Sequence, residues 1–77
     1  MNLSDKSARI KTLMNDDTFM EVISEVMERQ VAVFMDVHST TDERDGAHDI
    51  VRAINAISSY MEGVIADDKI SKRKRNK

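Results

Sequence analysis

Apolar residues recur at seven-residue spacing over residues 19–37 and 47–65, and this pattern restricts the fold more than any other feature of the chain. Side chains three, four and seven positions apart share one face of an α-helix, so each segment predicts a long amphipathic helix. The first segment has three such rows: Phe19, Val26 and Val33; Met20, Met27 and Phe34; and Ile23 with Val37. The second segment has two: Ala47, Ile54 and Met61; and Ile50, Ile57 and Val64.

Helix boundaries must be predicted from capping residues, because the chain contains no Pro and only two Gly. Asn15, Asp16, Asp17 and Thr18 are all N-cap residue types for the helix that follows them. Thr18 to Glu21 and Thr40 to Glu43 both have the spacing of a capping box, in which the two side chains bond each other's backbone amides. The stretch "LSDKSARIKTLM" predicts a shorter first helix with Ser4 as its N-cap. The sequence therefore predicts three helices and no strand.

These helices predict an all-α fold: an antiparallel helical hairpin with a short additional N-terminal helix. Two long helices joined by a short connection fold back on each other. Their apolar stripes are wider than one helix pair can cover, so we expect self-association or a partner to cover the remainder. Gln30 interrupts one stripe, either to fix register or oligomeric state or because it lies at the stripe's edge. The candidate protein-interaction residues are Phe19, Ile23, Met27, Phe34, Ile50, Ile54, Ile57 and Met61.

Charge divides the chain into an acidic helical domain, residues 1–68, and a basic tail, residues 69–77, which we expect to be disordered. The first part has a formal charge of −8 and the second of +6. Clustered Lys and Arg bind phosphate backbones by releasing counterions. The alternatives are a solvated end, or a tail that lies on the acidic body of a neighbouring copy. The candidate nucleic-acid residues are Lys72, Arg73, Lys74, Arg75 and Lys77.

No pattern of catalytic or cofactor-binding residues is present. Without Cys the chain has no thiolate ligand, and His38 and His48 do not have the spacing of a zinc motif. There is no Gly-rich phosphate loop and no nucleophile elbow. We therefore expect no metal, no cofactor and no enzymatic activity. Glu21, Glu25 and Glu28 share one helix face, which is either a solvated acidic stripe or a docking surface for a basic partner. Several Met residues lie on the apolar stripes, and we expect them to fill the core rather than form a docking groove.

No apolar run reaches the length of a bilayer-spanning helix, and the amino end has no signal-peptide pattern. We therefore expect no membrane partner and a cytoplasmic location.

The order of features resembles a class of small tailed-phage helical-hairpin proteins encoded among genes for head assembly and DNA packaging. The resemblance covers residues 10–70 and is carried by Leu13, Asn15 and Phe19 at one helix start, by Phe34 near that helix's end, and by the turn 40–46. The chain departs from the class in "IADDKI", where a Gly is expected, and in Phe34, where Trp is common. The resemblance implies a location in the host cytoplasm or the virion, and it implies no defined activity.

The sequence thus favours a non-enzymatic structural or accessory protein of phage type. It would self-associate or dock on a phage or host protein through the apolar face, and its tail would contact DNA or an acidic surface. The alternatives are a small nucleic-acid-binding regulator or packaging-associated factor, and an acidic inhibitor of a host protein.

Overall fold

The computed structural model of the protein describes residues 1–75, which form three helices and contain no strand. They are α1 (Leu3–Met14), α2 (Asp17–Met35) and α3 (Thr41–Arg75). The predicted all-α class is therefore confirmed.

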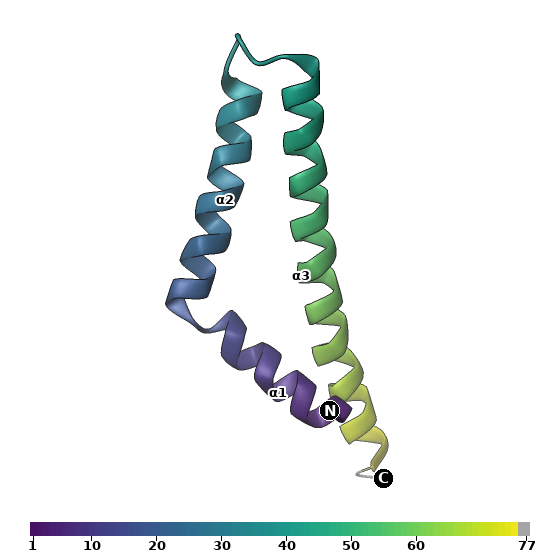
Figure 1. The fold of residues 1–77 in the computed structure, drawn as a ribbon. Coiled ribbons are helices and arrows are strands. Elements are labelled where there is room, and N and C mark those ends of the chain that lie inside the picture. The colour runs from purple at the N-terminus through teal and green to yellow at the C-terminus, as the bar shows by residue number, and fades with distance from the viewer. Residues whose placement is uncertain (76–77) are drawn as a thin grey trace.

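The three helices form an elongated molecule. α2 and α3 lie beside each other and run in opposite directions, and α1 crosses from the start of α2 to the far part of α3 (Figure 1). The principal extents are 59 × 23 × 18 Å. The long dimension follows from α3, whose 35 residues span about 52 Å at 1.5 Å per residue. α3 therefore extends past Asp17, the first residue of α2, and α1 packs on this extension.

Two helix starts lie earlier in the chain than predicted. Asn2 is the N-cap of α1, and its side chain accepts a hydrogen bond of 2.8 Å from the backbone N–H three residues later. Asp16 is the N-cap of α2 and accepts a bond of 2.7 Å from the Phe19 N–H. The prediction of Ser4 as a cap is therefore wrong; at the start of α2 the cap is Asp16, one of the four candidates, and not Thr18 with its capping-box spacing. Asn and Asp are at least as good N-caps as Ser and Thr, and here each precedes the predicted residue.

The predicted capping box at the start of α3 is confirmed. The Thr40 N–H donates to Glu43 Oε1 and the Glu43 N–H donates to Thr40 Oγ1, each at 3.1 Å. The Arg44 guanidinium also donates to the Ser39 carbonyl at 2.8 Å. These bonds fix the point at which the chain turns from α2 into α3.

Residues 69–75 continue α3 as its last two turns, unlike the disordered tail expected from residue 69. The physical reason is local. Lys72 pairs with Asp68 at i, i+4 spacing, with Nζ and Oδ2 2.9 Å apart, and such pairs stabilise helices. Lys and Arg also have high helix propensity and are favourable near a helix C-terminus.

Little of the apolar surface is covered by the chain itself. In the described part of the chain, Ala47 and Val64 are the buried apolar residues. The accessible surface is 6099 Å², against about 4,800 Å² for a compact monomer of this size. The radius of gyration is 16.9 Å, against about 11–12 Å for a compact domain of this length. The folded chain therefore leaves much of both apolar stripes in contact with solvent.

Candidate interaction surfaces

An apolar groove lies where the three helices meet. It encloses about 160 Å³. α1 contributes one side chain at the end of the groove, and α2 and α3 form its walls. Its lining is Met14 from α1, Phe19, Met20 and Ile23 from α2, and Ile54, Ile57, Ser58, Met61 and Glu62 from α3. Ser58 and Glu62 are its polar side chains, so the groove suits an apolar occupant rather than an ionic one.

The eight predicted protein-interaction residues all lie along α2 and α3. Those that line the groove are Phe19, Ile23, Ile54, Ile57 and Met61. Met27, Phe34 and Ile50 lie nearer the turn between the helices. Met27 is half-buried, and Phe34 and Ile50 are each 42% exposed. None of the eight is buried, although Ala47 and Val64 of the same stripe are, so much of the apolar stripe remains at least partly accessible.

Methionine contributes more to this accessible surface than the sequence suggested. Met14 and Met20 line the groove together with Met61, although Met residues were expected to fill a core. Met20 is exposed and Met14 is half-buried. The place of Met20 on the apolar face could be predicted from its seven-residue row with Met27 and Phe34. Met14 becomes part of the groove only because α1 is packed across its end.

Gln30 is buried within α2. Its Nε2 donates to the Val26 carbonyl of the same helix at 2.9 Å. This bond satisfies a polar donor that would otherwise be costly to bury.

A polar contact joins α1 to α3, and sequence reasoning did not identify it. The side chains of Ser7 and Asp68 are 0% and 1% exposed. Asp68 Oδ2 pairs with Lys72, whereas Asp68 Oδ1 and Ser7 Oγ make no hydrogen bond. Nearby, Lys6 Nζ donates to the Tyr60 hydroxyl at 2.6 Å and lies 4.8 Å from the centre of its ring. Only the Asp68–Lys72 spacing could have been read from the sequence, because the other pairs depend on helix packing.

Lys72 sets the charge state of the buried carboxyl. Its hydrogen bond and its positive charge lower the pKa of Asp68 below 3.8, and the positive charge of Lys11 acts in the same direction. Burial acts against them by disfavouring the charged form. Asp68 is therefore ionised at neutral pH.

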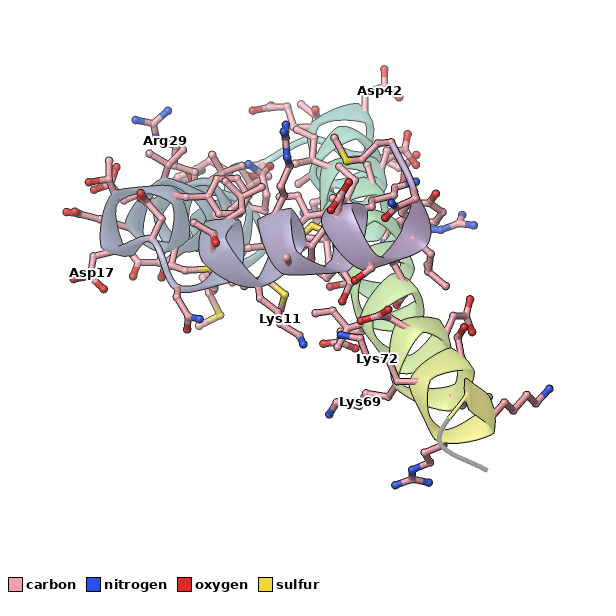
Figure 2. The ribbon with its side chains drawn as sticks, turned by 90° about the horizontal axis from the view of Figure 1, so that it is seen from below. Lys11, Asp17, Arg29, Asp42, Lys69 and Lys72 are labelled. Atoms are coloured by element: carbon pink, nitrogen blue, oxygen red, sulfur yellow. The ribbon has the colours of Figure 1, made fainter. Side chains whose placement is uncertain are left out.

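The basic end of α3 comprises Lys69, Lys72, Arg73 and Lys74, all of which are exposed. Lys69 and Lys72 project towards the side of the molecule on which Lys11 lies (Figure 2). Helical geometry fixes the spacing of these cations, which a disordered tail would not. The Arg75 side chain and Lys77, also predicted to contact nucleic acid, lie outside the described residues.

The other candidate groups are exposed to solvent. His38 and His48 are both exposed, and no cluster of three or more metal-ligating side chains occurs in residues 1–75. The acidic residues Glu21, Glu25 and Glu28 are exposed on α2. No helix among the described residues has both the length and the hydropathy to span a bilayer.

Comparison with known proteins gives no relative: no family model, curated protein or solved structure matches the chain. The resemblance to tailed-phage proteins therefore stays a prediction.

Proposed function

We propose that this is a non-enzymatic assembly protein that associates through the apolar face of α2 and α3 and contacts nucleic acid through its basic end. The observation that carries the proposal is that none of the eight stripe residues is buried in the single chain. Burying apolar surface contributes about 25 cal/mol per Å². An accessible stripe of this length thus favours association over a dispersed monomer.

The amount of uncovered surface is sufficient for a stable complex. The accessible area exceeds that of a compact monomer by about 1,300 Å². Each partner in a typical stable protein complex buries about 800 Å². This excess includes polar and apolar surface and reflects the elongated shape of the chain; its size exceeds the area that each partner covers in such an interface.

The basic end supports the second part of the proposal. Lys69, Lys72, Arg73 and Lys74 are exposed cations within about six residues of helix. No aromatic residue accompanies them, so they would bind phosphates without stacking on bases. The contact would be independent of base sequence and sensitive to salt. Head assembly or DNA packaging in a phage-infected cell or virion is the setting that the resemblance suggests.

A charged side chain within the groove tests the assembly. Ile57 is 57% exposed, so Ile57→Glu should leave the monomer folded while placing a carboxylate in the proposed interface. We expect the wild type to form oligomers and Ile57→Glu to be monomeric at the same concentration. Light scattering after size exclusion measures the mass, and circular dichroism verifies the helix content.

The matched control is Val22→Glu, because Val22 is 50% exposed but does not line the groove. It should retain the wild-type mass. A wild type that stays monomeric at millimolar concentration would reject assembly of the chain with itself.

A further inference from the structure

We propose that the groove is occupied by a second copy of this chain lying antiparallel, so that the basic end of each copy lies against the acidic turn end of the other. This inference rests on the proposed assembly and adds the identity and direction of the partner.

The first argument is the separation of charge along the long axis. The acidic turn end comprises Asp36, Asp42, Glu43, Asp45 and Asp49, with Arg44 as the basic residue among them. The basic end of α3 lies at the opposite extreme of the molecule (Figure 1). A parallel arrangement would bring like charges together at both ends, which disfavours association. An antiparallel arrangement brings opposite charges together at both ends.

The second argument is the position of the groove between these two ends. Ile57 is the most exposed apolar groove residue on α3, and it lies 15 residues from both Asp42 and Lys72. It also lies 12 residues from both Asp45 and Lys69. A two-fold axis near Ile57 therefore places Asp45 of one copy level with Lys69 of the other. At 1.5 Å per residue, both lie about 18 Å from the axis.

The third argument is shape. α2 and α3 lie side by side as one layer of two helices, within a molecule whose principal extents are 59 × 23 × 18 Å (Figure 1). Stacking two such layers face to face gives a four-helix arrangement, the usual solution for helices with one apolar face. A two-fold axis uses the same stripe on both copies, so a single surface covers itself.

The lack of native Cys makes the direction of the chains measurable, because an introduced thiol is the sole thiol in each chain. We would prepare Asp45→Cys and Lys69→Cys, mix them, and treat the mixture with a long, flexible bismaleimide, because both positions lie about 120° around α3 from Ile57. We expect the main cross-linked product to contain one chain of each variant. Asp45→Cys alone and Lys69→Cys alone should cross-link at least 10-fold less. Mass spectrometry of the cross-linked peptide identifies the joined residues.

A charge exchange provides an independent measurement. Asp42→Lys with Asp45→Lys, and Lys69→Glu with Arg73→Glu, should each weaken self-association at least 10-fold. An equimolar mixture of the two double variants should recover the wild-type mass as a mixed dimer. The control is Glu25→Lys with Glu28→Lys, which has the same change in charge on exposed positions away from both ends and should not affect association.

The outcomes separate this inference from the assembly itself. A dimer in which Asp45→Cys cross-links mainly to itself is parallel, and overturns the inference while leaving the assembly intact. A dimer without recovery in the charge-exchange mixture also overturns the inference. A monomeric wild type overturns both. Association of the wild type only with another polypeptide would assign the groove to a different occupant.

Discussion

At the residue scale, Asp68 is the side chain whose environment departs most from expectation. A carboxylate near the end of a polar helix is usually solvated, but this one is covered by α1 and retains a single ionic partner. The sequence could indicate the pair with Lys72 from its spacing. It could not indicate the burial, because Ser7 lies 61 positions away in the chain and meets Asp68 only through packing.

The lowered pKa of Asp68 predicts a pH-dependent contribution to stability. A carboxyl with a lowered pKa stabilises the fold above its unfolded value of 3.8, and that contribution is lost as the pH falls through the lowered value. We expect Asp68→Asn to reduce the melting temperature at pH 7. The difference from wild type should shrink below about pH 4. Thermal unfolding followed by circular dichroism at several pH values measures it.

Lys72→Gln is the control for this prediction, because Lys72 is the main cause of the shift. The Lys72→Gln variant should lose most of the same pH dependence of the melting temperature. Identical differences between wild type and Asp68→Asn at pH 3 and pH 7 would contradict the assignment.

At the element scale, the sequence indicated helices well and their ends less well. Seven-residue periodicity identified α2 and most of α3, and the capping box at Thr40 was correct. The starts of α1 and α2 were missed because several capping residue types follow one another there, and propensity does not rank them reliably. The continuation of α3 into the basic residues was missed because charge suggested a solvated tail, whereas the local ion pair and helix propensity favour helix.

Gly63 gives a prediction about α3. A Cβ at this position would meet no atom within 4 Å. Gly in a helix interior costs about 0.8–1.0 kcal/mol relative to Ala. We therefore expect Gly63→Ala to raise the free energy of unfolding by about 0.5–1 kcal/mol in urea denaturation. A loss of stability would show that a neighbouring molecule lies closer to this position than the single chain reveals.

At the scale of the whole molecule, the sequence predicted an uncovered apolar face, and the structure adds its shape. The eight stripe residues could be named from periodicity because a helix face follows directly from spacing. The groove could not be predicted from periodicity, because its end is formed by Met14, whose position depends on how α1 crosses the other helices. The partner and the binding of nucleic acid remain proposals.

Binding to nucleic acid can be tested by neutralising the basic end without disturbing Asp68. The triple variant Lys69→Gln, Arg73→Gln, Lys74→Gln keeps Lys72. We expect its affinity for duplex DNA to fall at least tenfold at low salt. The slope of log affinity against log salt should decrease by about 3, since each phosphate contact contributes roughly 0.9. Gel retardation or fluorescence anisotropy over a salt series measures both.

The matched control for DNA binding is Arg9→Gln, Arg29→Gln, Arg52→Gln, which removes the same charge from exposed positions elsewhere. It should retain most of the affinity. Equal loss in the two triple variants would assign binding to net charge rather than to the basic end.

The charge separation along α3 also gives the molecule an electric dipole. Asp42, Glu43, Asp45 and Asp49 lie in the first turns of α3 and Lys69, Lys72, Arg73 and Lys74 in its last turns, and α3 holds these two ends apart as one rod (Figure 1). In the field of a polyanion such a particle rotates before it makes contact. The proteins would then reach the polymer with their positive poles leading, and added electrolyte would remove this alignment by screening the field.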